Sequence, residues 1–106
     1  MKQHPHPDVN DINLIGVLAA LGDPVRLHIV TTLLAEGEKG STEFDCQVAN
    51  STLSHHIKQL REAGIVSHRK EGTRCFVSIR PEFETAFPGL LETVLRFAPA
   101  DDDAVA

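Results

Sequence analysis

The stretch STLSHHIKQLREAG, residues 51–64, carries the clearest helix pattern in the chain. Its apolar residues Leu53, Ile57 and Leu60 recur at intervals of four and three residues, so they share one face of a helix. A polar residue at position 50 or 51 is suited to cap the start of this helix, and Gly64 is suited to end it. The pattern predicts one apolar face for a core and one polar face for solvent or a ligand.

A β-hairpin is predicted directly after this helix. Residues 65–69 and 73–79 are rich in residues that favour strands. Between them, Lys70-Glu71-Gly72 has the composition of a tight turn in which glycine supplies a positive φ. Every second residue from Cys75 to Ile79 is apolar or a thiol, so these side chains should share one face of the second strand.

Two helices are predicted before this segment. Asp23-Pro24 marks the start of one, because aspartate accepts hydrogen bonds from free backbone N–H groups and proline tolerates the first helical position. Its expected buried face consists of Leu27, Val30, Leu33 and Leu34. An earlier helix, starting near Asp8 or Asn10, has two adjacent apolar stripes: Leu14, Leu18 and Leu21, and Ile12, Ile15 and Ala19. A helix that is apolar over so wide an arc needs a partner outside its own core, which indicates a dimer.

Weaker signals outline the remaining elements. Gly37 and Gly40 bracket a polar turn, and Thr42-Glu43-Phe44-Asp45 fits a capping box that opens a short third helix. Pro81 closes the second strand, and Pro88 is suited to the first position of a final helix. The apolar side of that helix consists of Leu90, Leu91, Val94 and Leu95.

The length of 106 residues is enough for one modest core, which favours a single domain. We expect residues 1–9 to form a flexible arm, residues 10–98 the folded domain, and residues 99–106 a disordered acidic tail. The predicted order is two helices, a short helix, a capped helix and a basic hairpin, which is typical of a winged helix-turn-helix. The predicted fold class is therefore mainly α with a small β-hairpin.

The distribution of charge points to one DNA-facing side. The net charge of the chain is −5, which by itself disfavours binding to phosphates. The segment from Ser51 to Arg80, however, contains six cations and two acids, a net charge of +4, whereas the remainder of the chain has a net charge of −9. Such asymmetry concentrates the positive field in the segment that contains the capped helix and the hairpin.

The polar face of the capped helix is the predicted recognition surface. Its candidate DNA contacts are Ser51, Thr52, Ser54, His55, Lys58 and Gln59. Hydroxyl, imidazole, amide and ammonium groups can reach base edges, and a helix N-terminus favours a nearby phosphate. The simpler interpretation is a polar first turn that caps and solvates a surface helix. His56 lies three residues after Leu53, so we expect it at the edge of the core.

The hairpin is the predicted wing. Arg69, Lys70 and Arg74 flank its tip, where they can reach phosphates or the minor groove beside the recognition helix. The alternative interpretation is a charged edge strand that prevents aggregation.

These stretches resemble the arsenic-repressor-type (ArsR/SmtB) family of bacterial regulators. The similarity lies in Leu21-Gly22-Asp23-Pro24-Val25-Arg26-Leu27, in residues 51–66 and in the wing from Arg69 to Cys75, and it extends over about Leu21 to Leu95. It implies a homodimer, formed through the first and last helices, that binds an imperfect palindrome in its own promoter, usually as a repressor. Half-sites are then expected roughly 34–36 Å apart, or a multiple of that distance.

The sequence departs from this family at its sensor sites. Arsenic and cadmium sensors carry paired cysteines in the third helix, whereas residues 43–49 contain Cys46 alone. Family members with zinc in the last helix use histidine and carboxylate ligands, but residues 88–97 hold no histidine and one acid. We therefore predict neither metal site and no cofactor. The sequence also shows no convergent polar pocket, so the effector is unknown.

Two weaker sensor hypotheses involve thiols and histidines. Cys46 and Cys75 are candidate redox residues that could form a disulfide or persulfide bridge, although Cys75 also fits a core position. His4 and His6 could bind a transition metal with a carboxylate of a partner subunit, although such a pair is more often part of an unstructured tail.

Other function classes fit less well. No catalytic set occurs in a workable context, because Ser54 and His55 are successive residues of one helix and diverge by about 100°. Without a membrane-spanning stretch or an apolar signal core, a cytoplasmic location is expected. The main alternative is a winged-helix module that binds a protein instead of DNA.

Overall fold

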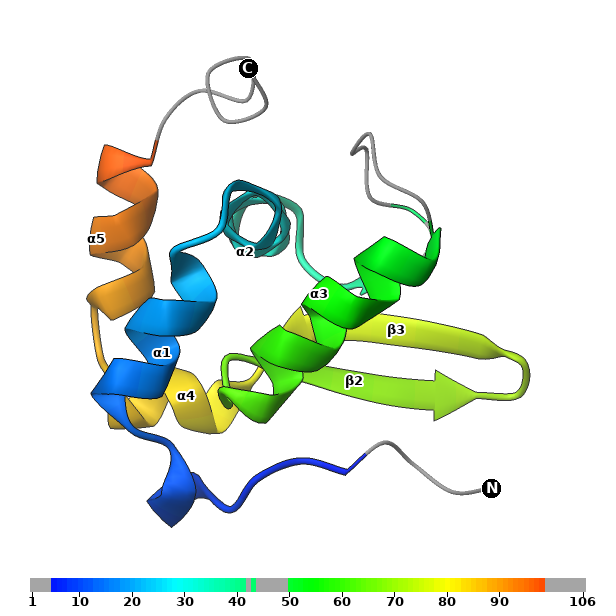
Figure 1. The fold of residues 1–106 in the computed structure, drawn as a ribbon, viewed down its shortest axis with the longest axis horizontal. Helices are drawn as coiled ribbons and strands as arrows, with labels where there is room; N and C mark the ends of the chain where they lie inside the picture. Colours follow the sequence, from blue (N-terminus) through cyan, green and yellow to red (C-terminus); the bar gives the residue numbers. More distant parts are fainter. Residues whose placement is uncertain (1–4, 42, 44–49, 99–106) are drawn as a thin grey trace.

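The computed structural model describes residues 5–41, 43 and 50–98 (Figure 1). The elements in chain order are η1 (Val9–Asp11), α1 (Leu14–Leu21), α2 (Pro24–Glu36), β1 (Lys39–Gly40), α3 (Asn50–Glu62), β2 (Val66–Glu71), β3 (Arg74–Ile79), α4 (Pro81–Ala86) and α5 (Leu90–Phe97). The predicted class, mainly α with a small β-hairpin, is confirmed. Apart from Glu43, the predicted capping box at 42–45 lies outside the described residues, as do most of the short third helix, His4, Cys46 and the acidic tail.

The three strands of the described residues form one antiparallel sheet in the order β1-β3-β2. Register runs from Val66 opposite Ile79 to Glu71 opposite Arg74, so the hairpin turns at positions 72 and 73 instead of over Lys70-Glu71-Gly72. Strand β1, predicted as a polar turn, is two residues long and pairs with β3. Its conformation comes from this pairing, which no local pattern indicates.

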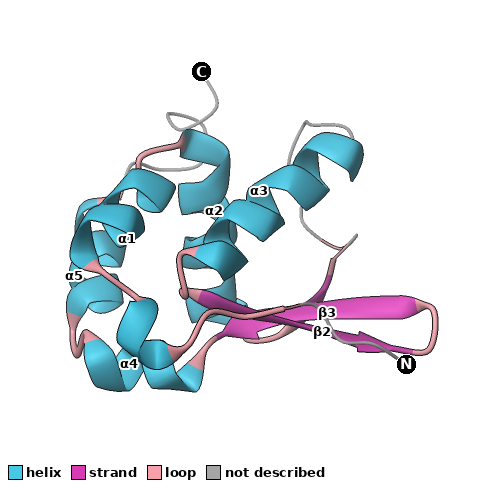
Figure 2. Cartoon of the chain, turned by 60° about the horizontal axis from the view of Figure 1, so that its bottom comes forward, coloured by secondary structure: helices cyan, strands magenta, loops and turns pink. Residues whose placement is uncertain are grey.

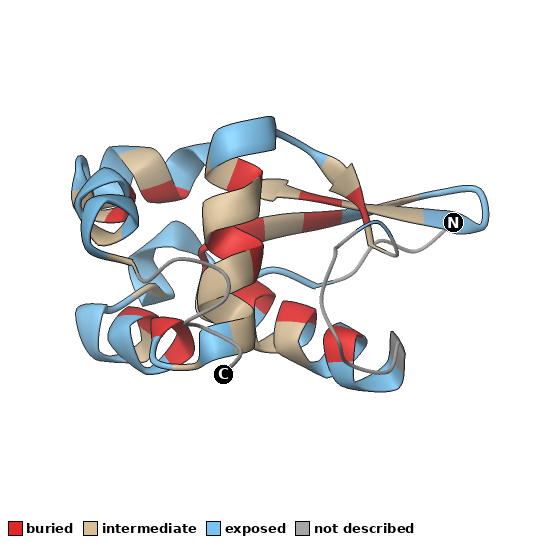
Figure 3. Ribbon diagram, turned by 90° about the horizontal axis from the view of Figure 1, so that it is seen from above, coloured by how far each residue is buried: buried red, intermediate tan, exposed pale blue. Residues whose placement is uncertain are grey.

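The helices cover one face of the sheet, and the core lies between them (Figure 2). Figure 3 shows the buried positions on the inward sides of the helices and along the sheet. The predicted apolar face of α3 is confirmed, because Leu53, Ile57 and Leu60 are all buried. Helix α2 begins as predicted, with Asp23 Oδ2 accepting hydrogen bonds from the backbone N–H groups of Val25 (2.9 Å) and Arg26 (3.1 Å).

Helix α1 has a different inward face from the one predicted. Its buried residues are Val17, Ala20 and Leu21, whereas Leu14 and Leu18 are 47% and 49% exposed and Ile15 is 76% exposed. The helix is apolar almost all round, so periodicity alone cannot select its core face. It also starts later than predicted, at Leu14, after the short turn η1.

The buried residues and the bounds of the other helices differ in detail from the predicted ones. On α2 the buried set is Ile29, Val30 and Leu33, with Leu27 and Leu34 half-buried. Pro81 does not simply end a strand: it begins α4, whose Phe83 is fully buried. The last helix starts at Leu90, not Pro88, because the intervening Gly89 adopts the left-handed conformation.

The segment before η1 is tied to the rest of the domain. The His6 imidazole Nε2 accepts a hydrogen bond from the backbone N–H of His68 at 3.0 Å, and an Nη1 of Arg80 donates to the Pro7 carbonyl oxygen at 2.8 Å. These contacts tie His6 of the predicted arm to the edge strand β2 and Pro7 to Arg80, directly after β3. No single described helix is long and apolar enough to cross a membrane. Among the described residues, only α1 and α2 taken together have the length and apolar composition of a membrane span, and they are bent by 101° at the break between them.

Candidate nucleic-acid interface

Helix α3 is anchored by its apolar face and presents a polar one. Of the predicted contacts, Ser51, Thr52, Ser54, His55 and Lys58 are exposed, whereas Gln59 is half-buried. The helix is held at its C-terminal end by Gly64, whose φ is +88°. The backbone N–H of Ile65 donates to the Leu60 carbonyl and that of Gly64 to the Arg61 carbonyl, which is the Schellman arrangement. Five of the six predicted helix contacts thus share the solvent side of a fixed helix.

The two adjacent histidines of α3 have different surroundings. His55 is exposed, whereas the side chain of His56 is only 13% exposed and its Nδ1 lies 3.7 Å from Asp23 Oδ2. Since Asp23 also caps α2, His56 connects the middle of α3 to the start of α2. This placement agrees with the expected position of His56 at the edge of the core.

Alternation along the strands separates the three wing cations. Val66, His68 and Val77 are buried beneath the helices, so Lys70 shares their face of β2. Arg69 projects from the opposite face, where its guanidinium carbon lies 4.6 Å from the centre of the Phe76 ring. Arg74 reaches the same ring at 5.2 Å. The wing therefore presents one cation on its helix side and two on its outer side.

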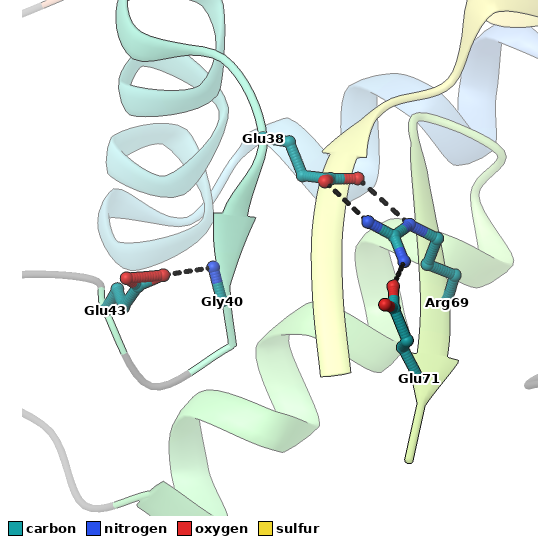
Figure 4. A network of polar contacts seen from close by, with 5 residues as sticks. All are labelled: Glu38, Gly40, Glu43, Arg69 and Glu71. Carbon is teal, nitrogen blue, oxygen red and sulfur yellow. Dashed lines mark hydrogen bonds and ion pairs between the residues drawn. The ribbon is translucent and has the colours of Figure 1, made fainter. Parts of the chain in front are cut away.

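The outer-side cation Arg69 is engaged by two carboxylates (Figure 4). Its Nη2 and Nε donate to Glu38 at 2.8 and 3.3 Å, and its Nη1 donates to Glu71. The hydrogen bonds to Glu38 and Glu71 raise the pKa of Arg69 above its ordinary value. The nearby hydrogen bond from the Gly40 N–H to Glu43 closes the turn after β1 (Figure 4). A phosphate that binds Arg69 must therefore compete with Glu38 and Glu71.

Two further cations of the basic segment point inward. Arg61 is buried, with its Nη1 3.3 Å from His68 Nδ1, and Arg80 is held by the Pro7 carbonyl and by Glu82. The charge of +4 counted along the sequence therefore overstates the field outside the molecule. Of the other predicted cations, Lys58 on α3 and Arg74 on the wing are exposed, and Lys70 on the wing is half-buried.

The candidate sensor residues are only partly described. Cys75 is half-buried in β3, and His6 bonds to β2 as described above. Within the described residues, no group of three or more histidine, cysteine, aspartate or glutamate side chains could hold a metal ion.

Comparison with known proteins extends these observations. Residues 21–69 match the model of a helix-turn-helix domain family. The chain is 39% identical over 82 residues to the uncharacterized HTH-type transcriptional regulator YceK of Bacillus subtilis, covering 74% of this chain and 82% of that protein. It is 36% identical over 72 residues to the arsenical resistance operon repressor of Staphylococcus xylosus, covering 66% and 68%.

A solved structure shows the same arrangement of elements. The reduced form of HlyU from Vibrio cholerae superposes with a TM-score of 0.66 at 27% sequence identity, covering 81% of this chain and 88% of that one.

Proposed function

The chain belongs to the arsenic-repressor-type (ArsR/SmtB) family of winged helix-turn-helix regulators, and on that premise we propose that it binds duplex DNA sequence-specifically and represses transcription. The main support for this proposal is the exposed polar face of α3. The opposite, apolar face of this helix is buried in the core, and a basic wing follows the helix.

In this proposal α3 lies in the major groove. Ser51 and Thr52, in the first turn, contact phosphate near the positive end of the helix dipole. Ser54 and His55 reach base edges together with Lys58 and Gln59, whose amide must turn outward from its half-buried position. Hydroxyl, imidazole and amide groups discriminate between bases, whereas the ammonium of Lys58 mainly adds affinity.

The wing adds contacts to the DNA backbone. Lys70 and Arg74 bind phosphates beside the recognition helix, and Arg69 does so after it exchanges Glu38. A guanidinium binds carboxylate and phosphate with the same geometry, so this exchange replaces one charge-assisted pair by another.

We also propose a homodimer formed through α1 and α5. These helices lie side by side (Figures 1 and 2) and expose a set of large apolar residues: Leu14, Ile15, Leu18, Leu95 and Phe97. Large apolar side chains left exposed on two neighbouring helices of a small domain are typical of a subunit interface. A two-fold axis through this patch would present two recognition helices to an imperfect palindrome.

Two single variants test the assignment of the DNA-facing surface. His55→Ala should reduce the preference for the native site over a scrambled one by about tenfold, as expected for the loss of one base contact. Lys70→Ala should weaken binding to both duplexes alike and lower the salt slope by about one. If both variants bind DNA as the parent does, α3 and the wing are not the binding surface, and a protein partner becomes the better explanation.

A further inference from the structure

A cavity of about 330 Å³ opens between α1, α2 and α3. Its floor consists of the small residues Gly16, Ala19, Ala20 and Ala63. Three polar side chains complete its lining: Arg26 from α2, and Gln59 and Glu62 from α3. The volume lies at the lower end of the range of small-molecule pockets, about 300–1,000 Å³. The residue spacing along the sequence gives no sign of this convergence, because the three helices contribute one to three residues each.

The charges in this cavity do not neutralise each other. The Nε of Arg26 donates to the Ala20 carbonyl oxygen at 2.7 Å, which orients the guanidinium. Among the described residues, the Nη groups of Arg26 and the carboxylate of Glu62 make no hydrogen bond or ion pair, with each other or elsewhere. A half-buried cation and an anion thus line one cavity with their bonding capacity toward it unused.

We propose that this cavity binds an α-amino acid with an apolar side chain. The ligand carboxylate pairs with the two Nη groups of Arg26, which offer a fork of parallel N–H donors. The ligand ammonium donates to Glu62 and to the side-chain oxygen of Gln59. The apolar side chain lies over the floor of glycine and alanine, where it loses its contact with water.

The proposed dimer interface borders this cavity on α1. On a helix with 3.6 residues per turn, Gly16 lies roughly 160° around α1 from Leu14 and Leu18, whereas Ala19 lies roughly 40° from Ile15. A second subunit that covers Leu14 and Leu18 therefore approaches α1 from the side opposite Gly16, and the interface meets the edge of the cavity at Ile15.

Binding of the ligand in the cavity should change the affinity for DNA. This step rests on the proposed function. Gln59 and Glu62 belong to the last turns of the recognition helix, and Gln59 is one of its proposed base contacts. A Gln59 amide bonded to the ligand cannot also turn outward to a base edge. The ligand should therefore lower DNA affinity, and by linkage DNA should lower ligand affinity by the same factor.

Calorimetric titration of the full chain, without DNA, tests the site itself. The probe is L-leucine, compared with 4-methylpentanoate, which lacks the ammonium, and 3-methylbutylamine, which lacks the carboxylate. Each lost charged hydrogen-bonding group should weaken binding about tenfold. If the three compounds bind equally, or L-leucine does not bind, the proposal is overturned.

Variants locate the binding within the cavity. Glu62→Gln should reduce the advantage of L-leucine over 4-methylpentanoate, and Ala19→Leu, which fills the cavity, should abolish binding of both. Arg26→Gln should abolish binding as well, but it also removes the hydrogen bond to Ala20, so the exposed Glu62 and Ala19 are the decisive positions. Arg96→Gln on α5 is the matched control and should bind L-leucine as the parent does. Unchanged binding by Glu62→Gln and Ala19→Leu places the ligand elsewhere.

The effect on DNA is measured separately. Saturating L-leucine should weaken binding of the parent to its DNA site at least about threefold, and it should have no effect on Ala19→Leu. Ligand binding with unchanged DNA affinity would overturn the coupling but not the site. Absence of DNA binding in the ligand-free protein would contradict the proposed function and leave the calorimetric result intact.

Discussion

Replacement of Gly64 by alanine should destabilise the domain by bringing a methyl group into the turn that ends the recognition helix. Gly64 has a φ of +88°, which L-residues with a Cβ rarely adopt. A Cβ at this position would lie 2.5 Å from Ile12 Cδ1 and 3.2 Å from Ile12 Cγ2, with Cγ1 also in contact. Because Cγ1 and Cγ2 both branch from one carbon, rotation of the Ile12 side chain cannot clear all of these contacts.

The size of the effect follows from two separate costs. The left-handed backbone costs an alanine about 1–2 kcal/mol. Overpacking against Ile12 adds about 1–3 kcal/mol. Gly64→Ala should therefore lower the free energy of unfolding by about 2–5 kcal/mol, out of the roughly 5–15 kcal/mol that is usual for a domain.

Gly72→Ala is the matched control, because Gly72 has a φ of +64° and no atom within 4 Å of the position of an added Cβ. It should show the backbone cost alone, about 1–2 kcal/mol. Urea unfolding followed by circular dichroism measures both variants. Equal destabilisation of the two would refute the reasoning, because it would mean that the contact between Gly64 and Ile12 does not constrain the end of α3.

Three further outcomes are expected. Asp23→Ala should lower the free energy of unfolding by about 1 kcal/mol, because the first turn of α2 loses its cap, and an unchanged urea midpoint would contradict that role. Ile15→Glu should convert the proposed dimer to a folded monomer by introducing a charge into the apolar patch; light scattering after gel filtration measures this, and an unchanged mass would exclude α1 from the interface. Glu38→Gln should raise DNA affinity and steepen its salt dependence, because Arg69 becomes available to a phosphate, and weaker binding would instead indicate that Glu38 serves to hold the wing in place.

Local signals were enough to predict the elements that frame the interface. Asp23 and Pro24 determine the start of α2 through hydrogen bonds within one turn, and the spacing of Leu53, Ile57 and Leu60 determines the face of α3 that enters the core. The hairpin was recognisable because strand-favouring residues flank a glycine. In each case the decisive interactions lie within a few residues of one another along the chain.

Elements that depend on tertiary packing were predicted less well. Strand β1 has two residues and exists because β3 lies beside it, and α4 is a six-residue helix positioned by the burial of Phe83. The inward face of α1 could not be chosen from a helix that is apolar nearly all round. The charge of the basic segment was overestimated for a similar reason, since the sequence does not tell whether Arg61 and Arg80 point inward.

Some features of the candidate interface follow from local sequence signals, and others depend on tertiary packing. The exposure of His55 and the burial of His56 followed from their places relative to Leu53 on one helix. The carboxylates around Arg69 did not, because Glu38 is far from it in sequence and meets it only across the sheet. The same limit applies to the cavity lined by Arg26, Gln59 and Glu62, which three helices create together.

The most direct test of the account is a fluorescence-anisotropy titration of the reduced protein at about physiological salt. The duplexes are tiled fragments of its own upstream region, sites selected from a randomised library, and scrambled versions of each. We expect at least one native or selected site to bind about a thousandfold more tightly than its scrambled version, with an affinity that falls steeply as salt rises. Equal affinity for every duplex would contradict sequence-specific DNA binding by α3 and the wing.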